Sequence, residues 1–224
     1  MTGGVPEVVE RFAGRAAGDG AARGARIAQR GEMLLRPGGR ALRFAAVQEI
    51  DARRVAFRWR ARFRLGPLRP LTVVDAYDAG GGVLDGRLAG VRLFRSEGPE
   101  VTLGQAMRYL AELAWVPSAV RANAALEWRG IDATTAEAAT ATDGGRAAVR
   151  LGFDAEADLV SVFSPDRPRL DGRAIAPTPW SGTFWDHAPA GGLRVPMRAE
   201  VAWHLPEGPF TYWRAEVTSV EVVR

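Results

Sequence analysis

Strict alternation of apolar and polar residues marks the segment at residues 55–65. Its sequence is VAFRWRARFRL, in which every second residue is apolar and four of the intervening positions are Arg58, Arg60, Arg62 and Arg64. A period of two places the apolar side chains on one face of a β-sheet and the arginines on the other. Residues 193–203 repeat the pattern, which is typical of antiparallel sheets with one solvated face. Pro196 has no backbone N–H to donate to a neighbouring strand, so this strand is expected to lie at the edge of the sheet or to carry a bulge.

Turn residues divide the rest of the chain into short apolar segments. Signals such as RPGGR, DAGGG, TDGGR and LPEGP recur at hairpin spacing. Further strands are expected at residues 26–35, 41–50, 71–77, 83–89, 91–95, 133–141, 146–153, 158–163, 180–187 and 211–222. About a dozen short strands favour a meandering sheet that curls to hide its apolar face. We therefore expect a mainly β fold of the α+β class, a single strongly curved antiparallel sheet or half-barrel, forming one domain over residues 1–224.

Two helical segments interrupt the strands. Residues 1–20 are expected to form an N-terminal helix and a loop, with the helix at residues 5–16. Residues 101–125 are expected to form a helical insert between two blocks of strands. Because an open curved sheet leaves its apolar face uncovered, we expect this insert to be a lid on the concave side.

The main helix of the insert is expected at residues 103–115. Thr102 and Gln105 have the spacing of a capping box at its start. Pro117 disfavours helical geometry at the residue before it, which sets the end of the helix. Its apolar stripe consists of Leu103, Met107, Leu110, Leu113 and Ala114.

Cysteine and histidine are too scarce to support metal or thiol chemistry. The chain has no cysteine, and its two histidines are His187 and His204. We therefore expect no disulfide, no thiolate nucleophile and no metal site. The glycine-rich segment DAGGGVLDG opens no helix and lacks the Gly-Lys-Ser/Thr of a phosphate loop, so no nucleotide cofactor is expected.

Charge and hydropathy indicate a soluble protein. All 30 basic residues are arginine and the formal net charge is +4, so the pI of 10.4 reflects the high pKa of arginine. A modest positive excess spread over the chain gives no expectation of nucleic-acid binding. The start of the chain lacks the pattern of a signal peptide, and no apolar run reaches about 18 residues. We therefore expect no membrane span and a cytoplasmic location.

Several long motifs in a fixed order carry a resemblance to a known family. They are VVDAYDAGGGVLDGRLAGV, RYLAELAWVPSAV, ALEWRGID, PTPWSGTFWDH and GGLRVPMRAEVAWHLPEGPFTYWRAEV. Over nearly the whole chain, the sequence resembles a family of uncharacterised bacterial proteins, largely actinobacterial, that is known only as a domain of unknown function. The family brings no established activity. Its usual Asp-Ser-Tyr reads Asp75-Ala76-Tyr77 here, and its Asp-Tyr pair reads Asp186-His187, which weakens the case for hydroxyl chemistry at either place.

The expected order of elements carries a second resemblance. An N-terminal helix, a strand meander, a central helical insert and a return to strands is similar to the half-barrel lipoprotein carriers of the periplasm. This resemblance implies the fold. Because a fold does not fix a function, it does not imply a lipoprotein cargo.

Arg108 and Glu112 lie one helical turn apart and can form an ion pair. We expect them, with Tyr109 and Trp115, at the edge of whatever the sheet encloses. The preferred interpretation is a pair on the protein surface. The alternative is a site at a cavity mouth, where Arg108 grips the anionic end of a ligand.

Other polar residues are weaker candidates. Asp75, Tyr77, Glu112, Asp186 and His187 are the groups to consider for catalysis, but no spacing pairs a base with a partner, so no catalytic residue is assigned. Asp75 and Tyr77 remain candidates for ligand contact. The arginine row at residues 58–64 is expected to be a solvated face neutralised by acidic residues on neighbouring strands, with RNA or membrane binding as the alternative.

Tryptophan is abundant enough either to fill a core or to line a pocket. Trp59 and Trp203 stand on apolar strand faces and are expected in the core. For the others, core packing is preferred over ligand contact by roughly two to one. The candidates for ligand contact are Trp115, Trp180, Trp185 and Trp213, together with Arg214 beside the last of them.

The expected function is binding rather than catalysis. A half-barrel closed by one helix either fills its interior with side chains or leaves a cavity of roughly 300 Å³ or more. We expect the second, with an apolar or amphipathic, lipid-like small molecule in the concavity and Arg108 near its polar end. The alternatives are a metal-independent, hydrolase-like enzyme using Asp, Glu, Tyr and Arg, and a structural or partner-binding protein with a filled core.

Overall fold

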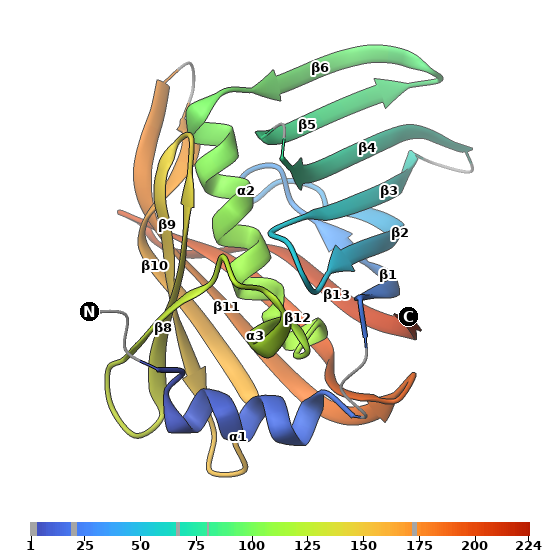
Figure 1. Ribbon diagram of the computed structural model, residues 1–224. Coiled ribbons are helices and arrows are strands. Elements are labelled where there is room, and N and C mark those ends of the chain that lie inside the picture. Colours follow the sequence, from blue (N-terminus) through green and yellow to red (C-terminus); the bar gives the residue numbers. More distant parts are fainter. Residues whose placement is uncertain (1–3, 19–21, 66–67, 80, 172–173) are drawn as a thin grey trace.

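One curved antiparallel sheet makes up most of the protein (Figure 1). The computed structural model describes residues 4–18, 22–65, 68–79, 81–171 and 174–224. Within these ranges, thirteen strands follow the order β6-β5-β4-β3-β2-β1-β13-β12-β11-β10-β9-β8-β7. Neighbours in the sheet are neighbours in the sequence, except that the first strand pairs with the last. This arrangement confirms the expected mainly β half-barrel.

The strands expected from the alternation are all present. Their bounds are β1 Gly24–Met33, β2 Leu42–Asp51, β3 Phe57–Leu65, β4 Leu68–Asp78, β5 Gly81–Leu88, β6 Val91–Glu97, β7 Glu127–Gly130, β8 Thr135–Thr142, β9 Gly145–Phe153, β10 Leu159–Asp171, β11 Ala174–Ala190, β12 Leu193–Leu205 and β13 Gly208–Val223. The short edge strand β7 was not expected. Strands β10 and β11 run well past the limits set from the sequence, because β10 continues beyond a bulge after Ser164.

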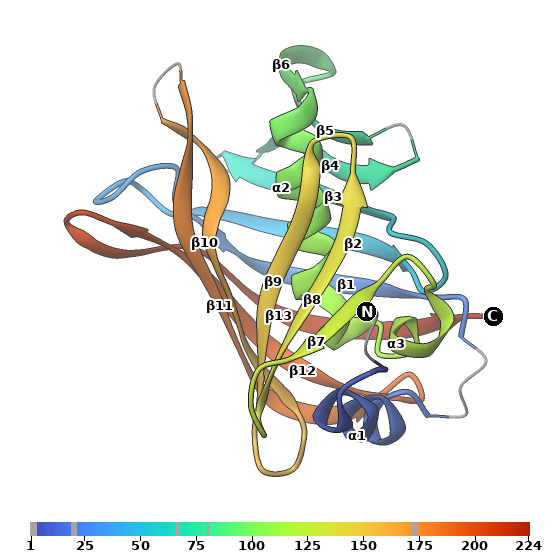
Figure 2. The ribbon, with the colours of Figure 1, turned by 60° about the vertical axis from the view of Figure 1, so that its left-hand side comes forward.

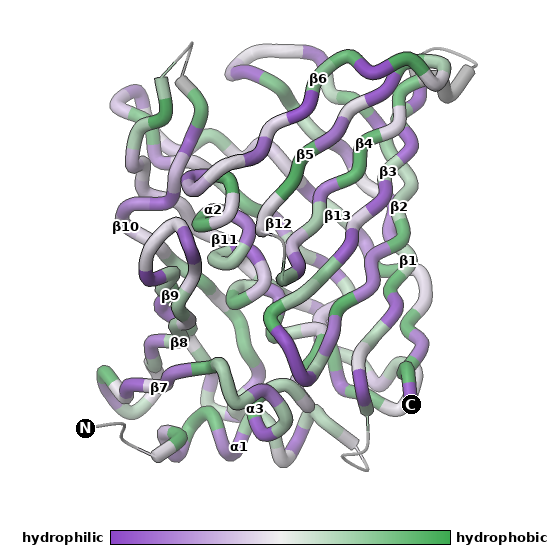
Figure 3. The backbone as a smooth tube through the Cα atoms, turned by 45° about the horizontal axis from the view of Figure 1, so that its top comes forward, coloured by the Kyte–Doolittle hydropathy of each residue, from purple (hydrophilic) through white to green (hydrophobic). Residues whose placement is uncertain are grey.

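Hydrophobic and hydrophilic residues alternate along β3 (Figure 3), and this alternation sets which side chains enter the core. Phe57, Trp59, Ala61 and Phe63 are buried, whereas the four arginines between and after them are exposed. The expected neutralisation by acids across the strands is wrong for two of these arginines. Arg60 lies between Val47 and Val74, and Arg62 lies between Ala45 and Thr72.

Pro196 lies within an inner strand, because β12 pairs with both β11 and β13. The expectation of an edge strand is therefore wrong. The register between β12 and β13 runs from Arg198 to Leu205, so Pro196 stands beyond the end of that ladder. On the other side, Pro196 pairs with His187 of β11. The proline is tolerated because the second ladder does not reach it.

Helix α2 (Pro99–Ala111) and the 3-10 helix η1 (Glu112–Trp115) fill the open side of the sheet (Figure 2). Helix α2 packs against β4, β5 and β6 near one edge and against β8, β9 and β10 near the other. The helix thereby spans the opening between the two edges of the sheet, which would pair with each other in a closed barrel. The expectation that this segment covers the concave side is confirmed.

The start of α2 differs from the expected capping box. The helix begins at Pro99, after Gly98 with a φ of 122°, and Thr102 lies inside its first turn. Proline is well suited to the first helical position. The hydroxyl of Thr102 instead accepts a hydrogen bond of 3.0 Å from the backbone N–H of Gly82. The end before Pro117 is as expected, with the last turn tightened to a 3-10 helix.

Two shorter helices close the lower end of the half-barrel in Figure 1. They are α1 (Glu7–Ala16) and α3 (Ala119–Ala122), which contact each other. Helix α1 buries Val9 and Phe12, and the Phe12 ring lies 5.6 Å from that of Phe153.

Candidate functional site

A cavity of about 340 Å³ lies between the sheet and the end of the α2–η1 segment. Its size falls at the lower end of the range of about 300–1,000 Å³ found for ligand pockets. The apolar lining is Met33, Leu35, Leu42, Trp59, Phe63, Leu71, Val73, Leu84, Phe94, Ala111, Trp115, Trp180, Phe184, Ala199, Val201 and Trp213. Five polar residues complete it: Asp75, Arg108, Glu112, Arg167 and Tyr212.

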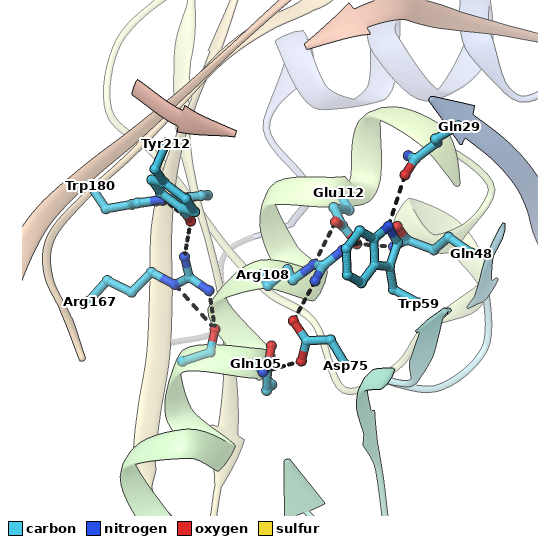
Figure 4. Close-up of polar contacts among 11 residues, drawn as sticks. Gln29, Gln48, Trp59, Asp75, Gln105, Arg108, Glu112, Arg167, Trp180 and Tyr212 are labelled. Carbon is cyan, nitrogen blue, oxygen red and sulfur yellow. Dashed lines mark hydrogen bonds and ion pairs between the residues drawn. The ribbon is translucent and has the colours of Figure 1, made fainter. Parts of the chain in front are cut away.

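Arg108 is the centre of a buried polar network (Figure 4). Its Nε donates to Glu112 Oε1 at 2.8 Å, its Nη1 to Asp75 Oδ2 at 2.5 Å and its Nη2 to Gln48 Oε1 at 3.3 Å. The amides of Gln48 and Gln105 donate to the second oxygens of Glu112 and Asp75. We call these five residues the Arg108 cluster. Each of the four carboxylate oxygens accepts a hydrogen bond.

The Arg108 cluster joins elements that are far apart in sequence. Arg108 and Gln105 come from α2, Glu112 from η1, Asp75 from β4 and Gln48 from β2. The expectation of a surface pair is wrong, because the side chains of Arg108 and Glu112 are only 15% and 10% exposed. The helix contacts strands on both sides, so its flanks are interior as well as its apolar stripe.

Burial dominates the electrostatics of the Arg108 cluster. Burial raises the pKa of Asp75 and that of Glu112, although Arg108 pulls both pKa values down. Burial on its own lowers the pKa of Arg108, but Glu112 and Asp75 together raise it above the usual value. The guanidinium also lies over the rings of Phe57 and Trp59, at 5.0 and 5.2 Å from their centroids. Arg108 thus places three of its five N–H donors on protein acceptors and has two carboxylates within ion-pair distance.

A second polar group lines the same cavity and lies apart from the Arg108 cluster (Figure 4). Arg167 Nε and Nη2 donate to the carbonyl of Gly104 at 3.4 and 3.2 Å, and Nη1 donates to the Tyr212 hydroxyl at 3.3 Å. Trp180 Nε1 donates to the same hydroxyl at 3.1 Å. The guanidinium lies 4.5 Å from the Trp180 ring and 5.5 Å from the Trp203 ring. We call Arg167, Tyr212 and Trp180 the Arg167 group.

Two β-bulges aim the Arg167 group into the cavity. Ser164 pairs with Trp180 but Arg167 pairs with Thr178, so two residues of β10 face one of β11. This shift turns Arg167 to the inner face. On β13, Trp213 pairs with Val201 and Thr211 with Ala202, which leaves Tyr212 as the extra residue. Tyr212 and Trp213 can therefore both line the cavity.

Six of the residues selected from the sequence meet in this cavity. They are Asp75, Arg108, Glu112, Trp115, Trp180 and Trp213. Trp115 is buried, with its Nε1 donating to the carbonyl of Pro196 at 3.0 Å.

Four other selected residues lie elsewhere. Trp185 and Arg214 line a separate hollow on the outer face of the sheet. The Tyr109 hydroxyl is directed away from the cavity, donating to the Asp51 carbonyl at 2.9 Å and accepting from Asn123, and burial raises its pKa. Tyr77 is half-buried outside the lining, and its pKa is raised by burial and by Asp143 and Asp78.

Metal-binding clusters and membrane-spanning helices are absent from the described ranges. No group of three or more His, Asp or Glu side chains there is arranged to hold a metal ion. No helix in the same ranges is long and apolar enough to cross a lipid bilayer. His187, a candidate for catalysis, lies outside the cavity, with its Nε2 3.0 Å from the Leu159 carbonyl.

The fold and site define a half-barrel protein with an internal, mainly apolar cavity. The chain matches the family of unknown function DUF6544 over residues 1–215 and belongs to it. The expected family of unknown function is therefore confirmed, whereas an actinobacterial origin stays a prediction. No curated protein matches the sequence significantly.

Solved structures of similar fold support the half-barrel assignment. A candidate outer membrane lipoprotein-sorting protein domain from Vibrio parahaemolyticus has a TM-score of 0.55 at 9% identity, covering 96% of this chain and 91% of that one. A DUF1329 family protein from Desulfovibrio piger has a TM-score of 0.53 at 8% identity, covering 96% and 90%. At these identities the likeness shows the fold alone.

Proposed function

We propose that this protein binds a single-chain amphipathic molecule of the lipid class in the cavity between α2–η1 and the sheet. The observation that carries the proposal is the cavity itself, which is walled by apolar side chains and has two polar groups at defined places. Such a composition suits a ligand with an apolar body and one polar end.

The cavity is open enough to admit a chain and apolar enough to retain it. Leu35, in the β1–β2 connection, and Phe94, in the edge strand β6, line the cavity while 73% and 41% exposed. These two residues form an apolar rim. Trp59, Phe63 and Trp213 lie deeper and are buried. Binding would bury the apolar surface of the ligand chain, which stabilises the complex by about 25 cal/mol for each Å² removed from water.

Catalysis by the Arg108 cluster is the alternative that the raised pKa values of Asp75 and Glu112 favour. Both carboxylates already accept a hydrogen bond on each oxygen, and burial is the main cause of both shifts. We therefore assign the Arg108 cluster a structural role, as the polar floor of a binding cavity.

The cytoplasmic location of the protein stays a prediction.

A neighbouring pair of valines on β4 provides a matched test of this proposal. Val73 lines the cavity, whereas Val74 is on the opposite face of the same strand. We expect Val73→Phe to weaken dodecanoate binding about tenfold or more by filling the cavity, and Val74→Phe to leave it within about twofold. Tryptophan emission during titration reports binding, because four tryptophans line the cavity. Equal affinity in Val73→Phe and the wild type would contradict the proposed site.

A further inference from the structure

We infer that the Arg167 group is an oxyanion subsite, which holds the carboxylate or phosphate head of the amphipathic ligand. This inference rests on the proposed function and makes it more specific, because it names the chemical class of the polar end and the residues that bind it. It also moves the expected polar contact from Arg108 to Arg167.

Arg167 and Tyr212 have hydrogen-bond donors that no protein group of the described ranges accepts. Arginine has five N–H donors, and Arg167 spends three of them on the Gly104 carbonyl and the Tyr212 hydroxyl. One N–H on each terminal nitrogen is left without a protein acceptor in the described part of the chain. The Tyr212 oxygen accepts from both Arg167 and Trp180, so its own hydrogen is free to donate. Three donors are thus available to a ligand.

The charges around Arg108 and Arg167 differ. Arg108 has two carboxylates within ion-pair distance, whereas no carboxylate of the described ranges lies that close to Arg167. Arg167 acts on Asp75 only at longer range. A ligand anion beside Arg108 would meet two negative side chains, while one beside Arg167 would meet an uncompensated guanidinium. The Arg167 group is therefore the better place for a negative head.

The fold holds the side chains of the Arg167 group in place. Arg167 is fixed by the helix carbonyl of Gly104 and by the Trp180 and Trp203 rings. The Tyr212 ring stacks on Trp203, with centroids 5.7 Å apart and planes 16° apart. A β-bulge directs Arg167 toward the cavity, and a second bulge does the same for Tyr212. A site with donors fixed before binding costs less entropy when an anion arrives.

The orientation of the ligand follows from the positions of the two polar groups. Arg167 and Tyr212 come from β10 and β13, whereas Arg108 comes from α2 and directs its guanidinium toward Asp75 and Glu112 (Figure 4). With the head at the Arg167 group, the chain lies along the apolar lining of Trp213 and Phe63. The Arg108 cluster, in which two carboxylates lie beside the guanidinium, is expected to contribute no bond to the head.

The test compares three probes with the same chain and different heads: dodecanoate, dodecyl phosphate and 1-dodecanol. We expect the wild type to bind the two anions more tightly than the alcohol. In Arg167→Gln, both anions should weaken about tenfold to a hundredfold, whereas the alcohol should change by about twofold or less. Comparison of the two anions shows whether a carboxylate or a phosphate fits better. Isothermal titration calorimetry measures all three affinities.

Further variants separate binding from folding. Arg167→Lys keeps the charge but loses the fork, and we expect an intermediate loss for the anions. Tyr212→Phe removes one donor and should weaken the anions by about threefold to tenfold. Arg60→Gln makes the same charge change on the outer face and should have no effect. If Arg167→Gln loses the same affinity for the alcohol as for the anions, or loses no affinity, the oxyanion subsite is wrong but the proposed binding function stands. If the wild type binds none of the three probes, the proposed function fails as well.

Discussion

Replacement of Arg108 by methionine is expected to lower the free energy of unfolding by about 3–5 kcal/mol at pH 8. The substitution leaves Asp75 and Glu112 buried beside each other without a cation, and breaking one partner of a buried ionic network carries this cost. Urea denaturation followed by circular dichroism measures the change. Removal of an arginine from an ion pair on the protein surface should lower the free energy of unfolding by much less.

The loss in Arg108→Met is expected to shrink as the pH falls. The pKa values of Asp75 and Glu112 are raised in the folded protein, so the folded state binds more protons than the unfolded state once the pH approaches those values. Stability therefore increases as pH decreases in that window, down to the ordinary pKa of the unfolded carboxyls. The variant should recover part of its stability at pH 5.

A triple variant provides the control for this interpretation. Arg108→Met combined with Asp75→Asn and Glu112→Gln removes all three charges and leaves amides that can still bond to Gln48 and Gln105. We expect it to be more stable than Arg108→Met alone at pH 8. If the single variant is as stable as the wild type at pH 8, the carboxyls are not ionised in the fold and the charge account of the cluster is wrong.

Trp115→Ala is expected to produce a loss of about 3–5 kcal/mol in the free energy of unfolding. The side chain of Trp115 is 2% exposed, its ring meets that of Phe184 edge-on at 5.5 Å, and its Nε1–H satisfies the Pro196 carbonyl. Truncation removes a large buried surface and leaves that carbonyl without its donor. The midpoint of guanidinium unfolding reports the change.

Trp185→Ala is the matched control, because Trp185 is half-buried on the outer face. We expect its loss to be about 1 kcal/mol. Similar losses for both variants would contradict the anchoring role of Trp115, which ties η1 to β12.

The alternation pattern was enough to predict the sheet, because burial on one face imposes a period of two whichever strands are neighbours. It placed Phe57, Trp59 and Phe63 inside and the intervening arginines outside, as the structure has them. Pro117 likewise marked the end of the central helix, since proline restricts the residue before it. These signals are local, so one sequence is enough to show them.

The polar groups of the cavity could be predicted only in part. Arg108 and Glu112 were found because they are one turn apart on a helix, but their contacts with Asp75 and Gln48 depend on strands that are remote in sequence. Of the Arg167 group, Trp180 was selected from the sequence, whereas Arg167 and Tyr212 were missed. Pro165 lies in the bulge of β10 and Pro168 follows Arg167, so this segment looks like the end of a strand. A bulge also reverses the face assigned by alternation.

The central claim is that an amphipathic chain binds between α2–η1 and the sheet, and a crystal structure of the complex with dodecanoate tests it most directly. The account predicts electron density for the chain along Trp213 and Phe63, with the carboxylate within hydrogen-bond distance of Arg167 and Tyr212. A structure obtained at saturating dodecanoate in which this cavity holds no chain, or in which the chain lies on another surface, would contradict it.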